Sequence, residues 1–302
     1  MKRAFMKIKM SVGDRIFTLT NHLLLALAVL VVVYPLYIIL IASVSDPYAV
    51  MRGEVLLYPK NISTIGYERL LKHKDIWIAY GNTVLYTVVG TMLNVVLTLM
   101  AGYALTRNFI GKKFINLYFV FTMFFSGGLI PTFLQVKTYG LYNSPLIMVL
   151  MGAISVWNVI IARTFIKNSL PEELYEAAVM DGCSHIRYFM KIVLPLSKAL
   201  MGVLVVYYAV GHWNDYMTGL IYIRSRNYQP LQVILKELLT SLQVTDSMSQ
   251  MLSDVADTEL VMRVAESVKY CAIVISTVPI LVLYSCMQKF FVKGVMIGSL
   301  KG

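Results

Sequence analysis

Residues 23–44 read LLLALAVLVVVYPLYIILIASV and contain no charged side chain. A helix needs about 20 apolar residues to cross the hydrocarbon core of a membrane, and this stretch is long enough. It also exceeds the apolar core of a cleaved signal peptide, which is about 7–15 residues long. Although Ser43-Val44-Ser45 has the small-residue pattern of a cleavage site, we expect the stretch to be retained as a membrane-spanning helix.

The rest of the chain repeats this pattern. Only 14% of the 302 residues are charged and 58% are hydrophobic, whereas soluble domains carry about 25% charged residues. The ten-residue alternating segments of a membrane barrel are absent from the sequence. We therefore predict an all-α polytopic membrane protein with one domain over residues 1–302, and not a soluble enzyme. Its six transmembrane helices are expected at 23–44, 84–105, 114–136, 146–162, 199–216 and 270–287.

Lysine and arginine predict the orientation. Loops on the cytoplasmic side of a membrane carry an excess of these residues. With both termini in the cytoplasm, the inner segments hold more of them than the outer ones, so this orientation is favoured. The net charge of +11 then reflects topology and does not indicate a nucleic acid partner. The inner segments are 1–22, 107–113, 163–198 and 288–302, and the outer ones are 45–80, 137–145 and 215–269.

The predicted spans contain almost no ionisable residues. Carriers driven by protons or ions keep such residues inside the bilayer, but here the first four spans have none between their ends. The fifth carries only His212 and Asp215, near its outer end. The pattern argues against a secondary transporter and an intramembrane enzyme, and it predicts that transport energy comes from elsewhere. Three cysteines without metal-ligand spacing predict neither a disulfide framework nor a metal site.

Small and polar residues form a helical stripe on the second predicted span: Thr87, Gly90, Thr91, Asn94 and Thr98. Two interpretations fit. Small residues and hydroxyls allow close packing between membrane helices, or the stripe forms the wall of a polar pathway. In the third span, Gly127-Gly128 and Pro131 predict a kink.

Residues 163–198 predict a helix–turn–helix outside the bilayer. Ser169 and Glu172 fit a capping box, which starts a helix expected to run to Met180. Gly182 has the position of a C-terminal glycine with positive φ. A second helix follows from Ser184, and Pro195 is expected to end it. The apolar face predicted for this second helix consists of Ile186, Phe189, Met190 and Val193.

This loop resembles the EAA motif of ABC importer permeases. The matching residues are Glu176, Ala177, Ala178, Gly182, Ile192, Leu194 and Pro195, with Asp181 before the glycine. Residues 101–107, 126–131, 226–232 and 290–302 extend the resemblance over nearly the whole chain. They are similar to the carbohydrate-uptake branch related to the maltose permeases, and to a Gram-positive subgroup that imports oligosaccharides. Cys183 and Ser299 depart from that pattern, since alanine is common at both positions.

The resemblance implies a permease subunit in a bacterial cytoplasmic membrane. Such subunits form half of a transmembrane dimer, here expected to be a heterodimer with a second permease. Their EAA loop, called the coupling loop below, seats in a groove of an ABC ATPase dimer. A lipid-anchored binding protein delivers the sugar, expected here to be an oligosaccharide. The chain has no Walker motif, so the resemblance places ATP and Mg²⁺ on the partner ATPase and no cofactor in this chain.

Neutral amides and aromatic faces suit sugar rings, so we select candidate pathway residues: Asn94, Trp157, Asn158, His212, Trp213 and Asn214. The alternative for the tryptophans is anchoring at the membrane surface. In the outer segment 215–269, an amphipathic stretch with Leu231, Ile234, Leu235 and Leu238 is expected to lie along the membrane interface. Residues 240–258 are expected to form a flexible loop, which either contacts the binding protein or is plain surface.

A second class of function also fits these features: a membrane-embedded assembly or export factor whose loop docks a soluble partner. Neighbouring genes for a second permease and a lipoprotein would distinguish the importer from this alternative.

Overall fold

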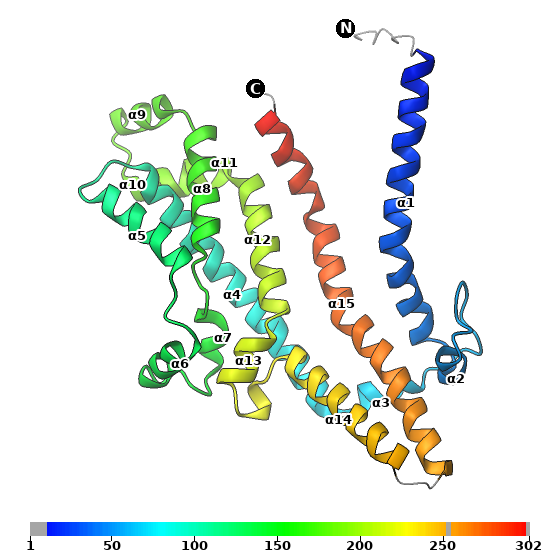
Figure 1. Ribbon diagram of the computed structural model, residues 1–302. Coiled ribbons are helices and arrows are strands. Elements are labelled where there is room, and N and C mark those ends of the chain that lie inside the picture. Colours follow the sequence, from blue (N-terminus) through cyan, green and yellow to red (C-terminus); the bar gives the residue numbers. More distant parts are fainter. Residues whose placement is uncertain (1–10, 252–254, 300–302) are drawn as a thin grey trace. The chain divides into compact units, whose positions relative to one another are not determined.

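The computed structural model describes residues 11–251 and 255–299, with side chains for 11–241 and 265–288. Within these residues every regular element is a helix (Figure 1), which confirms the all-α class. The chain divides into two compact units: Met1–Leu70 with Leu242–Val274, and Leu71–Ser241 with Ile275–Gly302. Whether these two units together form the single domain expected over residues 1–302 stays a prediction.

The first unit contains a long apolar helix and the short helices that follow it. α1 begins with a capping box, in which Ser11 Oγ accepts from Asp14 N at 3.2 Å and Asp14 Oδ2 accepts from Ser11 N at 3.0 Å. This cap satisfies backbone donors that a helix start otherwise leaves unpaired. The helices here are α1 (Val12–Ser43), α2 (Pro47–Met51), α3 (Ile65–Lys72) and the first part of α15 (Val255–Ser299).

Three of these helices meet at Gly66 of α3. A Cβ at this position would overlap Ser267 and Cys271 of α15, so only glycine allows the approach. The end of α1 joins the same contact, because Tyr67 OH donates to Ser43 Oγ at 2.9 Å and Cys271 Sγ donates to Ser43 O at 3.4 Å. Burial raises the pKa of Tyr67, so its phenol stays protonated as the donor.

The second unit is built around α4, which packs mainly against α12 and α8. Gly102 of α4 permits the contact with α8, because a Cβ there would lie 2.8 Å from the Ala162 side chain. The elements are α4 (Lys74–Thr106), α5 (Lys112–Phe124), α6 (Leu129–Thr138), α7 (Pro145–Leu150), α8 (Val156–Ser169), α9 (Glu172–Met180), α10 (His185–Tyr188), η1 (Phe189–Val193), α11 (Leu194–Leu196), α12 (Lys198–Trp213), α13 (Tyr216–Tyr222), η2 (Arg226–Tyr228), α14 (Leu231–Met251) up to Ser241, and α15 from Ile275.

Not all six predicted spans are single helices. Among the described residues, three helices are long and apolar enough to cross a membrane, or up to five spans if each of two bent pairs counts as one. α5 and α6 meet at 115°, and the break at Phe125–Gly128 confirms the kink predicted at Gly127-Gly128. The predicted span 146–162 is divided between α7 and α8, since Gly152 takes a φ of +69° between them.

The outer segment differs from its prediction. Residues 240–251 continue α14 and residues 255–258 begin α15, so the expected flexible loop is helical where it is described. The physical reason is that no glycine or proline interrupts the sequence between Pro230 and Pro279. Leu231, Ile234 and Leu235 are buried within the protein, so the apolar side of this stretch packs against other helices. Its placement along the membrane interface stays a prediction.

Candidate functional site

The coupling loop begins where α8 ends. A residue before proline is disfavoured in the helical conformation, and Leu170 (φ −112°, ψ 107°) accordingly breaks the helix ahead of Pro171. The predicted capping box is wrong, because Ser169 is the last residue of α8 and the N-cap of α9 is Pro171, which makes no side-chain hydrogen bond. Glu172 and Glu173 still place negative charge at the positive start of α9, where it is favourable.

The turn between α9 and α10 depends on Gly182, whose φ of +72° confirms the predicted conformation. Gly182 N donates to Val179 O and Cys183 N donates to Ala178 O, both at 2.9 Å. This pair of bonds is a Schellman motif, which satisfies the last carbonyls of a helix. Ser184 then caps α10 by accepting from Arg187 N at 3.4 Å. The predicted helix–turn–helix is confirmed.

The second half of the loop contains a π turn that the sequence did not predict. Leu194 N donates to Phe189 O five residues back, within η1. Pro195 does not end the helical segment, which continues to Leu196 and turns by 82° before α12. Proline lacks an N–H and crowds the carbonyl four residues earlier, and a π turn is one of the places where a helix absorbs such a disruption.

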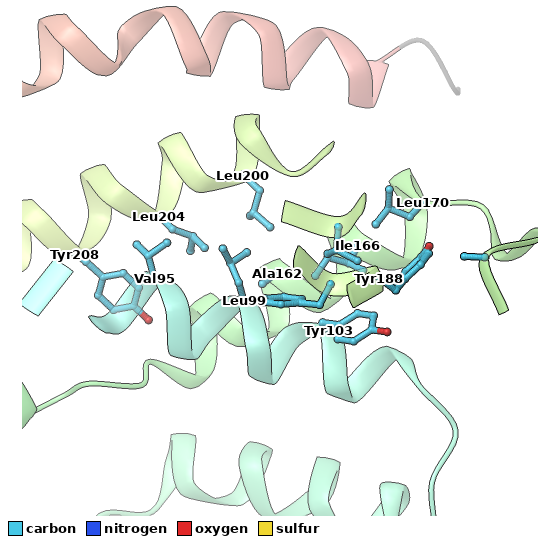
Figure 2. Close-up of a cluster of buried hydrophobic side chains, with 13 residues drawn as sticks. Val95, Leu99, Tyr103, Ala162, Ile166, Leu170, Tyr188, Leu200, Leu204 and Tyr208 are labelled. Atoms are coloured by element: carbon cyan, nitrogen blue, oxygen red, sulfur yellow. The ribbon is translucent and has the colours of Figure 1, made fainter. Parts of the chain in front are cut away.

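One side of the coupling loop is fixed in a hydrophobic core. Ala178 of α9 and Tyr188, Phe189 and Val193 of the following segment are buried there. Figure 2 shows Tyr188 beside Tyr103 at one end of the cluster. Fully burying an aliphatic or aromatic side chain contributes about 1.5–3 kcal/mol, so this side holds the loop firmly. The other members are Val95, Leu99, Tyr103, Ala162, Ile166, Leu170, Leu200, Leu204 and Tyr208.

The opposite side exposes large apolar residues beside acidic ones. Met180 is 87% exposed, Ile186 78% and Met190 57%. Glu176 is also exposed, and these four residues are called the exposed face below. The predicted apolar face of the second helix is therefore divided, because Phe189 and Val193 point into the core whereas Ile186 and Met190 do not. Ala177, Asp181, Gly182 and Pro195 are likewise exposed, and Ile192 and Leu194 are half-buried.

The polar stripe of α4 is buried against α12. Asn94 Nδ2 lies 3.0 Å from His212 Nε2, and Thr98 Oγ1 lies 2.6 Å from Tyr208 OH. Gly90 lies under the His212 ring, which a Cβ would overlap. These contacts support the packing interpretation of the stripe, and a pathway role for Asn94 and His212 stays a prediction.

The other pathway candidates have different surroundings. Trp213 is buried and donates from Nε1 to Ser276 O at 2.8 Å, so its indole fixes α12 to α15 rather than anchoring at a membrane surface. Asn158 is buried at the start of α8, whereas Trp157 is 57% exposed. Asn214 is exposed and donates to Val210 O of its own helix at 3.0 Å. Of the six candidates, the structure brings Asn94 and His212 into contact.

A cavity of about 750 Å³ lies along α13, η2 and α14. Arg224, Arg226 and Lys236 line it, together with the single carboxylate of Glu237. Arg226 bonds to Asp75 at 2.5 Å and to Glu237 at 3.0 Å. The hydrogen bonds that Arg226 donates to Asp75 and then to Glu237 raise its pKa, so it keeps its charge. Among the described residues no three His, Cys, Asp or Glu side chains gather, so no metal ligands are assigned there.

Among the described residues, the apolar helices of membrane-spanning length define a multi-pass membrane protein with a half-buried loop outside the spans. The chain belongs to the family described as binding-protein-dependent transport system inner membrane component, which matches residues 8–297.

Named relatives agree with this class. The polygalacturonan/rhamnogalacturonan transport system permease protein YtcP of Bacillus subtilis is 35% identical over 291 residues, covering 96% of this chain and 99% of its own. The arabinooligosaccharides transport system permease protein AraQ of Halalkalibacterium halodurans is 24% identical, covering 90% and 92%. A solved bacterial ABC transporter involved in the import of the acidic polysaccharide alginate has a TM-score of 0.83 at 30% identity, covering 94% and 100%.

These matches make the chain a permease subunit of an ABC importer, of the branch whose members carry sugars, and not an enzyme. Membership in the family implies that it works with other components of such an importer. The alternative of an assembly or export factor is excluded. Arg107 entered the sequence analysis only as the end of the stretch 101–107 and was given no role. Its guanidinium carbon lies 3.8 Å from the ring centre of Tyr175 in the coupling loop.

Proposed function

We propose that this chain imports an oligosaccharide as half of a heterodimeric permease in a bacterial cytoplasmic membrane, with both termini in the cytoplasm. Its partners are a second permease subunit, an ABC ATPase dimer that binds ATP and Mg²⁺, and a lipid-anchored sugar-binding protein. The observation that carries the proposal is the coupling loop, which is buried in the core on one side and presents Glu176, Met180, Ile186 and Met190 on the other.

The coupling loop moves as a rigid body and transmits the movement of the ATPase to the membrane helices. ATP closes the ATPase dimer, the docked loop moves with it, and the helices change from inward-facing to outward-facing as a two-state element. The residues assigned to this coupling are Glu176, Ala177, Ala178, Asp181, Gly182, Ile192, Leu194 and Pro195. Ala177 leaves room for close approach, whereas Ala178 and the half-buried Ile192 and Leu194 join the loop to the core.

Docking is tested by Glu176→Lys. An exposed ion pair is worth about 0–1 kcal/mol, but losing one partner of a desolvated pair costs about 2–5 kcal/mol. We expect the variant permease to reach the membrane and to recover at least tenfold less ATPase by co-purification in detergent. Lys113→Glu, a charge reversal at an exposed residue in the first turn of α5, is the control and should recover normal amounts. Wild-type recovery with Glu176→Lys would show that this carboxylate faces water in the complex.

We further propose that the cargo is an acidic oligosaccharide that carries uronic acids. Two observations support this. The relatives named for polygalacturonan and for alginate, both carboxylated polymers, are more similar to this chain than the arabinooligosaccharide permease. The cavity along α13 and α14 also carries three cationic side chains, of which Arg226 is paired with Asp75 and Glu237, so the cationic side chains exceed the carboxylates by one. A cavity with net positive charge raises the local concentration of an anionic substrate.

Uptake by the complete importer tests the cargo. Labelled trigalacturonate should enter cells that express the importer, and its fully methyl-esterified form, which lacks the charge, should compete at least tenfold less well. Arabinotriose is the neutral comparison. Uptake of arabinotriose without uptake of trigalacturonate would overturn the acidic cargo and keep the importer. Uptake of none of these sugars or other oligosaccharides in a panel would overturn the importer for oligosaccharides.

A further inference from the structure

Arg107 lies directly after α4, as its C-cap residue, and aromatic rings surround it. Its guanidinium carbon lies 3.8 Å from the ring centre of Tyr175 in α9, 5.0 Å from that of Tyr103 in α4 and 5.4 Å from that of Tyr188 in α10. A cation within about 6 Å of a ring face is attracted by the ring quadrupole. These four residues, called the arginine cage, join α4 to both helices of the coupling loop.

The rings of the cage also contact one another. Tyr175 and Tyr188 meet edge to face with centres 5.2 Å apart, and Tyr103 lies 6.1 Å from Tyr188. Figure 2 shows Tyr103 and Tyr188 adjacent at this end of the core. His185 extends the set, since its Nδ1 lies 3.4 Å from the hydroxyls of both Tyr103 and Tyr175. The cage is therefore one continuous contact between α4, α9 and α10.

No carboxylate forms an ion pair with Arg107 among the side chains that the structure describes. Its Nε is buried and has no hydrogen-bond partner. The three rings therefore hold this arginine as a cation near aromatic faces, with Tyr175 nearest at 3.8 Å. Guanidinium makes such contacts better than the compact ammonium of lysine. Such a contact requires the rings to keep their positions. A movement of Tyr175 or Tyr188 would therefore displace Arg107 and, with it, the end of α4.

The covalent connections of the coupling loop are less direct. The chain bends at Leu170 and Pro171 after α8, and again by 82° before α12. Bends of this kind can absorb a displacement of α9 and α10. The arginine cage bypasses both bends, because it links each loop helix to α4 through side chains, beside the hydrophobic core that Tyr188 and Phe189 share with Tyr103. α4 in turn packs against α8 and α12, so movement at its end reaches the other helices of this unit.

We propose that Arg107 is the positioning residue through which displacement of the coupling loop reaches α4. This inference rests on the proposed function, in which an ATPase moves the loop. It assigns Arg107 to transmission and not to docking, because Arg107 is not part of the exposed face. Variants at Arg107 should therefore separate ATP hydrolysis from sugar movement while the ATPase stays bound.

The experiment uses the complete importer in liposomes, with ATPase recovery, basal hydrolysis and sugar moved per ATP measured on the same sample. Arg107→Ala should recover normal amounts of ATPase and keep basal hydrolysis within twofold, while sugar moved per ATP falls at least tenfold. Arg107→Lys keeps a cation near the rings and should restore transport in part. The control is Lys113→Ala, which removes an exposed cation from the first turn of α5 and should behave as wild type.

Variants at Tyr175 distinguish attraction to the ring from mere filling of space. Tyr175→Phe keeps the ring face and loses the hydroxyl, so coupling should stay near wild type. Tyr175→Leu keeps apolar volume without the ring and should uncouple as Arg107→Ala does. If Tyr175→Phe and Tyr175→Leu moved the same amount of sugar per ATP, the arginine cage would not be the contact that couples the loop to α4.

Two further outcomes are decisive. Wild-type sugar movement per ATP with Arg107→Ala would overturn the proposal. Loss of ATPase recovery with Arg107→Ala would show that the residue supports folding of the loop, and would overturn it too. The proposed docking role of the loop is tested by a different result. Normal ATPase recovery with Glu176→Lys would contradict docking without bearing on Arg107.

Discussion

Gly182 supports the coupling loop through its backbone conformation alone. A Cβ built at this position meets no atom within 4 Å, so a side chain would not clash with a neighbour. Its φ of +72° is nevertheless a region that ordinary residues rarely adopt. Forcing an L-residue into it costs about 1–2 kcal/mol, and a β-branched residue is the most strained, whereas asparagine tolerates it.

Gly182→Val should therefore distort the Schellman turn and reduce sugar uptake at least tenfold, while the permease still inserts into the membrane. Gly182→Asn is the matched variant and should retain most uptake, since it adds a side chain of similar reach without the strain. Uptake in cells and ATPase recovery in detergent are the measurements. Normal uptake by the valine variant would show that the turn is not needed for coupling.

Single residues differ in how far the sequence predicted them. The positive φ of Gly182 was predictable because it depends on the glycine and the helix end beside it. The arginine cage was not, because its rings belong to three helices whose packing decides whether they meet. The outward direction of Ile186 and Met190 was missed for a related reason. Helical periodicity shows that residues share a face, but the apolar pattern alone does not show which apolar residues cover the core.

Pairs of helices depend on close contacts at small residues. α4 and α12 meet where the ring of His212 lies over Gly90, with Asn94 Nδ2 3.0 Å from His212 Nε2. Without the small residue the ring would be pushed away and this contact would lengthen. The contact between α4 and α12 can be tested with a control on the same helix, because Gly81 of α4 has open space around it.

Gly90→Ala should lower stability by about 1–3 kcal/mol, the usual cost of overpacking a tight contact. Gly81→Ala should be neutral or stabilising by about 0.5–1 kcal/mol, because alanine favours a helix where no atom is displaced. The midpoint of thermal unfolding in detergent measures both. His212→Ala combined with Gly90→Ala should recover part of the loss, and additive losses would contradict the contact.

Helices were predicted well where their own stretch of sequence determines where they begin and end. α1 and α4 are continuous helices over nearly all of the predicted spans 23–44 and 84–105, because both stretches are long and apolar. Pro35 in the first and Gly90 and Gly102 in the second stand singly, without the paired glycines that divide α5 from α6. α5 and α6 are divided where the glycines occur. The π turn before Pro195 and the helical course of 240–251 were missed. Proline was taken as a helix end, and a polar sequence without glycine or proline was taken as a loop.

For the whole molecule, composition predicted an all-α membrane protein, and the EAA residues predicted the family to which the chain belongs. The six spans were counted from hydropathy, which registers apolar residues but not the angle between helices, and only the kink at Gly127-Gly128 was predicted. Two bent pairs therefore look like single spans in the sequence. The heterodimer and the orientation of the termini depend on partners and on a membrane, and they stay predictions.

The exposed methionines of the coupling loop make the unassembled subunit sensitive to oxidants. Met180 and Met190 are 87% and 57% exposed, and peroxide converts a thioether into a polar sulfoxide. We expect both to gain oxygen quickly in the free permease and slowly once the ATPase covers them, by mass spectrometry of peroxide-treated samples. Met148, only 1% exposed, should stay unmodified in both. Peroxide stress would then block assembly of new importers while sparing those already assembled.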